Sequence, residues 1–309
     1  MLAYILRRLV QVVPVFIGAT LLIYFMVFAM PGDPIAALFG DKQPPEAVLE
    51  QLRARYMLDQ PFIVQYLHYL GGILRLDFGT TFSGQSVMEV LGRTFPVTLR
   101  LAVMAIVISF VLSIVIGGAS ALLKGTVFDH AMLVVALIFI AVPIFVLAFL
   151  AQYFLGVQLE WFKPTVGANN DWGDLWLPAI VLGFSIYAAS MRLTRSSMID
   201  TLGQDWVRTA YSKGLSRGRV IPVHVLRNSL IPMVTDIATN FGILMVGATV
   251  TEGIFNVPGV GNTLFQAIIR HETPTVVSFV TVFVIVYVLV NLLVDLLYGL
   301  LDPRIRYVK

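Results

Sequence analysis

Long apolar runs alternate with short polar segments along this 309-residue chain. A helix needs about 20 predominantly apolar residues to cross the hydrocarbon core of a bilayer. Six runs approach or exceed that length, and the fourth is the shortest. The runs are Leu9–Met30, Val97–Leu123, Ala131–Val157, Leu175–Met191, Leu230–Thr251 and Thr275–Leu301. Pro143 interrupts the third run, and we expect it to kink that helix. The pattern therefore predicts an all-α, polytopic membrane protein with six transmembrane helices.

The composition favours the same class. Hydrophobic residues make up 58% of the chain and charged residues only 13%, whereas soluble domains carry roughly 25% charged residues. There is no cysteine, which excludes disulfides and thiolate metal sites. The first apolar run follows Arg7 and Arg8 and is longer than a signal-peptide core, so we expect a retained signal anchor.

The distribution of Lys and Arg predicts the orientation, because cytoplasmic loops are enriched in both residues. With a cytoplasmic N-terminus, 13 of the 21 Lys and Arg residues fall on the cytoplasmic side, seven of them in the loop of residues 192–229. Only four of the 18 acidic residues fall on that side, against 12 outside. We therefore expect both termini in the cytoplasm.

Residues 31–96 are too polar to cross a membrane and follow the first span. Helix starts are expected at Pro44–Glu46 and Asp59–Pro61, and a third short helix near Ser86–Thr94. Gly71–Gly72 is expected to weaken the far end of the second helix. The chain thus divides into residues 1–30 with the first span, a small helical extracytoplasmic insertion at 31–96, and a core at 97–309.

The segment Asp205–Pro232 is polar although it lies between two apolar runs. Asp205–Tyr211 has helical composition, Gly214 should end or bend that helix, and Arg217–Arg219 predicts a turn. The small residues Ala210 and Gly214 are four apart, which leaves a groove on one face for close packing. A partner could grip such a helix, whereas basicity alone would only set the topology.

No catalytic constellation is present in the sequence. The four histidines lie in different loops, and His271–Glu272 lacks the second histidine of H-E-x-x-H. Neither a G-x-x-x-x-G-K-[ST] phosphate loop nor a G-x-S-x-G elbow occurs. We expect no enzyme activity, no metal site, and no ATP hydrolysis through a phosphate loop of its own.

Asp236 lies inside the fifth apolar run, with Asn240 one helical turn further on the same face and Thr239 nearby. A charge at the bilayer centre costs roughly 2.5–3.5 kcal/mol even on lenient scales. These residues are therefore candidates for a water-lined translocation path. An internal hydrogen bond or an ion pair between helices would explain Asp236 equally well.

At the polar segment the sequence resembles the inner-membrane permeases of bacterial ABC importers, and more narrowly the dipeptide/oligopeptide permease family. Of the general E-A-A-x-x-x-G…I-x-L-P pattern only Ala210, Gly214 and Leu226 match, and Arg208 replaces the glutamate. The peptide-permease variant RTAxxKGL…HxLRNxLIP fits throughout. Four other landmarks extend the resemblance over nearly the full chain: MPGDP at Met30–Pro34, LDQPFIVQYLHYL at Leu58–Leu70, TEGIFNVPGVG at Thr251–Gly261 and NLLVDLLYGLLDPRIR at Asn291–Arg306.

The resemblance implies a type I importer permease in the bacterial inner membrane. It would form a pathway with a second homologous permease and receive substrate from an extracytoplasmic solute-binding protein. Two cytoplasmic ATPases would bind ATP and Mg²⁺, so this chain would hold no cofactor and contact no nucleic acid. One ATPase would dock on the coupling segment, whose expected contact residues are Asp205, Arg208, Thr209, Ala210, Lys213, Gly214, Leu215 and Arg217.

Alternatives remain at this point. The same machinery imports nickel, glutathione or haem in related systems, so the substrate is open. A self-contained secondary transporter would be expected to show internal repeats, and the chain has no obvious repeat. A membrane enzyme would need the catalytic residues that the sequence lacks.

Overall fold

The computed structural model describes residues 2–28, 46–55, 57, 59–81, 83–167 and 171–301. These residues are mainly helical, and their only β contact is an isolated bridge between Thr80 and Ser86. Contacts divide the chain into two units: residues 1–98 with 258–309, and residues 99–257. The landmark Met30–Pro34 lies outside the described residues.

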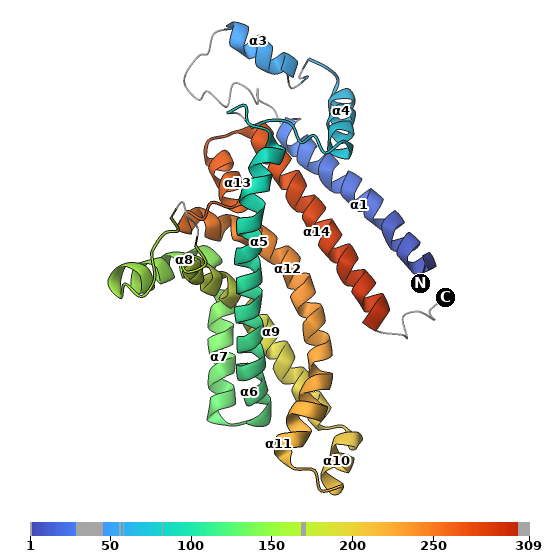
Figure 1. The fold of residues 1–309 in the computed structure, drawn as a ribbon, viewed down its shortest axis with the longest axis vertical. Coiled ribbons are helices and arrows are strands. Elements are labelled where there is room, and N and C mark those ends of the chain that lie inside the picture. The colour runs from blue at the N-terminus through green and yellow to red at the C-terminus, as the bar shows by residue number, and fades with distance from the viewer. Residues whose placement is uncertain are drawn as a thin grey trace. The chain divides into compact units, whose positions relative to one another are not determined.

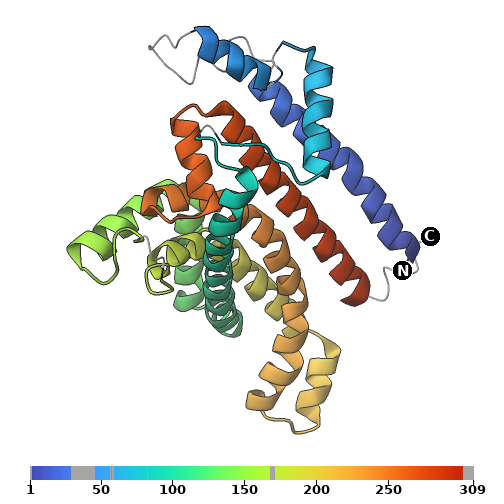
Figure 2. The ribbon, with the colours of Figure 1, turned by 45° about the horizontal axis from the view of Figure 1, so that its top comes forward.

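The first unit is built around two long apolar helices that run side by side in Figures 1 and 2, α1 and α14. Its elements are α1 (Leu2–Phe28), α3 (Glu46–Arg55), α4 (Phe62–Leu74), the start of α5 (Val87–Leu112), α13 (Val260–Ile269) and α14 (Thr273–Leu301). Tyr24, Tyr66 and Val277 form its buried cluster. The hydroxyls of Thr20 and Tyr66 lie 3.0 Å apart and join α1 to α4.

The second unit is organised around α9, which contacts most of its neighbours. Its elements are the rest of α5, the π-helical η1 (Ser113–Gly117), α6 (Gly118–Leu122), α7 (Val127–Ala141), α8 (Ile144–Ala151), the π-helical η2 (Gln152–Gln158), α9 (Trp176–Leu202), α10 (Asp205–Ser212), α11 (Arg217–Val220), the π-helical η3 (Ile221–Leu226) and α12 (Arg227–Phe255). Leu101, Leu182 and Leu244 lie at the centre of its main core, where α5, α9 and α12 meet.

Glycines let the helices of this unit approach closely. A Cβ on Gly117 would lie 2.6 Å from the carbonyl oxygen of Met191, and one on Gly183 would lie 2.8 Å from that of Ala105. No Cβ fits at such distances, so the contacts of α9 with η1 and α5 require glycine.

The loop before α9 is fastened to the end of α12. Gln152 Nε2 donates to the carbonyl oxygens of Pro164 at 2.8 Å and Ile254 at 3.2 Å. Lys163 Nζ lies 2.7 Å from Asp174 Oδ1, and this carboxylate raises the pKa of Lys163. The predicted orientation places this fastened loop on the outer side of the membrane.

Several apolar helices have the length of a membrane span. Four qualify among the described residues: Arg7–Met26, Val87–Leu122, Trp176–Leu202 and Thr273–Leu293. A fifth is obtained if α7 and α8 with η2 are taken as one span. The predicted fifth run lies in α12, which is 29 residues long. The all-α membrane architecture is thus confirmed, while the count of six and the orientation stay predictions.

The third predicted span, Ala131–Val157, is not one continuous helix. The chain bends by 103° between α7 and the helix that follows. Val142 is extended, with ψ 123°, and Pro143 begins the next segment. A residue before proline avoids the helical region, and proline cannot donate the backbone hydrogen bond. The expected kink is therefore a break.

Helix α4 includes Gly71–Gly72 and ends at Leu74, two residues beyond them. Two other local predictions were wrong. The separate short helix expected near Ser86–Thr94 is the beginning of α5, which contains Pro96. The expected turn at Arg217–Arg219 is the first turn of α11. In both places the segment continues into a longer helical stretch, because tertiary context often overrides local signals for a helix end or a turn.

Candidate coupling site

The short helix α10 has one buried face and one exposed face. Val207 and Ala210 are buried, whereas Asp205, Trp206 and Arg208 are exposed. Figures 1 and 2 show α10 and α11 together at one end of α9 and α12. The predicted helix is confirmed. One of its faces packs within the chain, and the other face is exposed.

The buried face belongs to an apolar cluster within the second unit. Its buried members are Ala121, Met198, Val207, Ala210, Val220 and Val225, contributed by α6, α9, α10, α11 and η3. Leu215 packs against the cluster from the side. Burial of apolar surface from five elements holds α10 against the membrane helices that it connects.

Ala210 and Gly214 serve the chain itself and do not leave a free groove. Ala210 is only 8% exposed because it packs in this cluster. Gly214 ends the helix in the left-handed region, with φ 80°, and its N–H donates to the Tyr211 carbonyl at 2.9 Å. Nothing lies within 4 Å of a Cβ at this position. The predicted groove for a partner is therefore wrong, and backbone conformation explains the glycine.

The exposed face is aromatic and basic. Trp206 is 41% exposed and Tyr211 36%. Arg208 lies 3.9 Å from Asp205, with both side chains at least 80% exposed. Thr209, Lys213 and Arg217 are exposed as well. The sequence had not singled out Trp206 and Tyr211, although large aromatics on a short polar helix are the signal that could have identified them.

Hydrogen bonds close the base of the coupling segment. Ser197 Oγ on α9 donates to the Ser229 carbonyl on α12 at 3.0 Å. Ser229 Oγ lies 3.1 Å from Thr201 Oγ1. The two ends of the segment are thus joined to each other, and on the α9 side the junction lies four or more residues before α10 begins, so the segment projects from a fixed base.

Asp236, Thr239 and Asn240 lie along α12 with different surroundings. The Ser190 hydroxyl of α9 donates to Asp236 Oδ2, which is the hydrogen bond between helices that the sequence left open. Thr239 is exposed and donates to the Thr235 carbonyl at 3.2 Å. Asn240 is 9% exposed, and its amide nitrogen finds no hydrogen-bond partner among the described residues. Their place in a pathway stays a prediction.

An ion pair beside the coupling segment was not predicted. Arg195 on α9 binds Asp129 at the start of α7 through two hydrogen bonds of 2.6 and 2.7 Å. The two residues are 66 positions apart in sequence. The charge distribution placed both on one side of the membrane, but it could not indicate that they meet.

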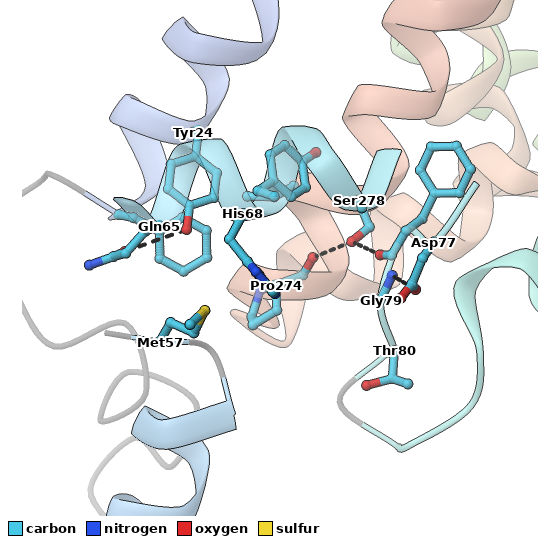
Figure 3. A pocket seen from close by; sticks show the side chains of 14 residues that line it. Tyr24, Met57, Gln65, His68, Asp77, Gly79, Thr80, Pro274 and Ser278 are labelled. Atoms are coloured by element: carbon cyan, nitrogen blue, oxygen red, sulfur yellow. Dashed lines mark hydrogen bonds between the residues drawn. The ribbon is translucent and has the colours of Figure 1, made fainter. Parts of the chain in front are cut away.

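A cavity of about 310 Å³ lies in the first unit, and none of the predicted site residues lines it. Tyr24, Gln65, His68 and Asp77 are among its lining residues, as Figure 3 shows. Asp77 Oδ1 accepts a 2.9 Å hydrogen bond from the backbone N–H of Gly79. Gln65 Oε1 accepts a hydrogen bond from the Tyr24 hydroxyl and Gln65 Nε2 donates to the Gln60 carbonyl, so both ends of this side-chain amide have partners within the protein.

Comparison with known proteins identifies the family of this helical membrane protein. Residues 113–307 match the model of the binding-protein-dependent transport system inner membrane component, and residues 1–102 match the N-terminal model of such membrane components. The chain belongs to this family. Its family members are transport components of the inner membrane, which makes this chain a multi-pass inner-membrane permease and not a member of an enzyme family.

Full-length relatives carry consistent descriptions. The chain is 38% identical to the dipeptide transport system permease protein DppB of Escherichia coli K12, with 100% of both chains covered. It is 35% identical to the di/tripeptide transport system permease protein DppB of Pseudomonas aeruginosa, with 99% of each chain covered. It is 36% identical to a putative peptide transport system permease protein of Brucella abortus, covering 99% of this chain and 100% of the relative. A transport system of this family implies ATPase and solute-binding partners.

Proposed function

We propose that this protein is a permease subunit of an ABC importer for di- and oligopeptides. The relatives that support this substrate align over their full length and are described as peptide permeases. Nickel, glutathione and haem are not favoured, because none of these three relatives is described as importing them. A secondary transporter is disfavoured by membership of a binding-protein-dependent family.

The observation that carries the proposed mechanism is the division of α10 into two faces. Val207 and Ala210 fix the helix to the permease, while Trp206 and Arg208 remain outside. Trp, Tyr and Arg are the residue types most enriched among interface hot spots. The exposed face of α10 is therefore the docking surface for a cytoplasmic ATPase.

The charge of this surface specifies the partner. Arg208, Lys213 and Arg217 are exposed on the coupling segment, against the single exposed carboxylate of Asp205 on α10. Complementary potentials favour correct docking and raise association rates. The ATPase groove should therefore present acidic side chains, with one opposite Arg208 where the wider family has glutamate.

The proposed complete importer has four core subunits. This chain pairs with one homologous permease, and each permease binds one ATPase that carries ATP and Mg²⁺. An extracytoplasmic binding protein delivers the peptide. Asp236, Thr239 and Asn240 are proposed to face the pathway between the permeases, and Thr239 supports this role because it is exposed in the isolated chain. This chain itself holds no cofactor.

Co-purification tests the proposal. The chain is tagged, its associated subunits are identified, and the complex is reconstituted in liposomes with the binding protein. We expect an ATPase and a second permease in the complex, with ATP hydrolysis stimulated by dipeptides and not by nickel, glutathione or haem. Purification without any ATPase, or stimulation by a non-peptide substrate only, would contradict it.

A matched pair of variants tests the docking face. Trp206→Ala removes an exposed aromatic and should weaken ATPase binding about thirtyfold, as expected for a hot spot of about 2 kcal/mol. Trp176→Ala is the control, because Trp176 is similarly exposed, at 48%, but lies at the opposite end of α9 from α10. Equal ATPase recovery with both variants would place the docking surface elsewhere.

A further inference from the structure

The side chains of Asp129 and Arg195 form a two-pronged ion pair. Arg195 Nε donates to Asp129 Oδ1 at 2.6 Å, and its terminal nitrogen Nη2 donates to Oδ2 at 2.7 Å. Asp129 is 1% exposed and Arg195 21%. A guanidinium and a carboxylate joined by two parallel hydrogen bonds are fixed in direction as well as in distance.

The turn between α6 and α7 holds the carboxylate from the other side. The backbone N–H of Gly125 donates to Asp129 Oδ2 at 2.9 Å, and Thr126 caps α7 by accepting from the Asp129 N–H at 3.4 Å. Gly125 has φ 79°, the left-handed region that favours glycine. Asp129 therefore fastens this turn to α9 through a single side chain.

Helix α6, which leads into this turn, is packed against α9 and α10. A Cβ on Gly118 would lie 3.3 Å from Met198 Sδ, and Ala121 shares an apolar cluster with Met198 and Ala210. Helix α9 ends at Leu202 and α10 begins at Asp205. The turn, the end of α9 and the coupling helix thus form one continuously packed block, which we call the cytoplasmic block.

We infer that Asp129 and Arg195 are positioning residues for transport, which make the α6–α7 turn move together with the coupling helix. Protein interiors are close-packed and transmit displacement. A pull on α10 reaches α9 through the chain and reaches the turn through the ion pair. The predicted second and third spans, which this turn joins, then move together with the predicted fourth span. The three helices thus act on the pathway as one rigid body. The inference rests on the proposed docking of an ATPase at α10.

The number of ATP molecules hydrolysed per peptide imported tests this role, because a pair that serves stability alone would leave it unchanged. The complete complex is reconstituted with binding protein and a dipeptide, and both rates are measured in the same liposomes. Asp129→Asn keeps the side-chain shape and removes the charge. Arg195→Lys keeps the charge and removes the planar fork. We expect each variant to raise the ratio about two- to thirtyfold, the range of residues that couple distant sites.

Asp200→Asn is the control, because it neutralises an exposed carboxylate of α9 on the same predicted side of the membrane, outside the docking face. An unchanged ratio in both test variants would overturn the inference. If Asp129→Asn does not assemble, the ratio of Arg195→Lys decides. Failure of both complexes to assemble would also overturn it, because the pair would then be needed for folding alone.

Failure of the positioning role can be distinguished from failure of the proposed docking at α10. If Trp206→Ala still reduces ATPase recovery while the ratio is unchanged in the ion-pair variants, docking at α10 stands and the positioning role falls. If Trp206→Ala and the ion-pair variants are all without effect, docking at α10 is itself wrong.

Discussion

Two ion pairs on the predicted cytoplasmic side differ in nearly every physical respect. Asp129 and Arg195 lie on different helices, 2.6 Å apart, with the carboxylate 1% exposed. Asp205 and Arg208 lie three residues apart on one helix at 3.9 Å, and both are at least 80% exposed. The first pair stabilises the folded structure. The second is weak enough for a partner to separate, because exposed pairs contribute little to stability.

The difference shows how this permease combines rigidity with recognition. The cytoplasmic block buries its own contacts, including Ala210 and the Asp129 carboxylate. On the coupling segment, Trp206 and Arg208 remain exposed. A partner can therefore exert force on the exposed groups without disturbing the contacts that transmit it.

The largest effect is expected from removing one member of the buried pair. Asp129→Ala leaves the Arg195 guanidinium without its counter-ion and should lower the free energy of unfolding by about 3 kcal/mol, the lower end of the range for buried pairs. Water reaches Arg195, which is 21% exposed, and limits the loss. Thermal unfolding of the detergent-purified protein measures it. Asp205→Ala should leave the melting temperature unchanged, and equal shifts in both variants would remove the distinction between the pairs.

A smaller loss is expected from overpacking the contact between η1 and α9. Gly117→Ala places a Cβ 2.6 Å from the Met191 carbonyl oxygen. The Met191 oxygen is a backbone atom, and Thr194 Cβ, which would lie 2.9 Å from the added carbon, is bonded directly to the backbone. The helices must therefore separate, at a cost of about 2 kcal/mol. Gly92→Ala on α5 is the control, because nothing lies within 4 Å of its Cβ. The melting temperature should fall only for Gly117→Ala, and an unchanged value would mean that η1 and α9 are loosely packed against each other.

The smallest expected change in stability comes from Asp236. Asp236→Leu removes the hydrogen bond from Ser190 and should reduce the free energy of unfolding by about 1 kcal/mol. Thr239→Val, at an exposed position, should not change stability. Both variants should reduce peptide uptake if this face lines the pathway. Normal uptake with both would assign Asp236 to helix packing alone.

The sequence predicted the elements better than their contacts. Apolar length located α9 and α14, and composition located α10, because these signals are local. The break at Pro143 was expected only as a kink, since the extended Val142 depends on how proline restricts the residue before it. Pro96, by contrast, is accommodated inside α5. A proline in an apolar run is therefore compatible with either outcome.

The candidate site shows the same limit. The spacing of Ala210 and Gly214 was visible, but not that Ala210 packs on Val220 and Val225 within its own chain. The pairing of Asp129 with Arg195 joins residues far apart in sequence, which a single sequence does not reveal. Which groups are buried decides which remain for a partner, and burial is a property of the tertiary structure.

The most direct test of docking through the exposed face of α10 is quantitative recovery of the ATPase with the tagged permease carrying Arg208→Glu. Arg208 is 80% exposed, so the folded permease should keep its melting temperature. We expect the ATPase yield per permease to fall about tenfold as like charges oppose one another, and to recover when an acidic residue of the ATPase groove is changed to Arg. An unchanged yield, with intact permease, would contradict docking at this face.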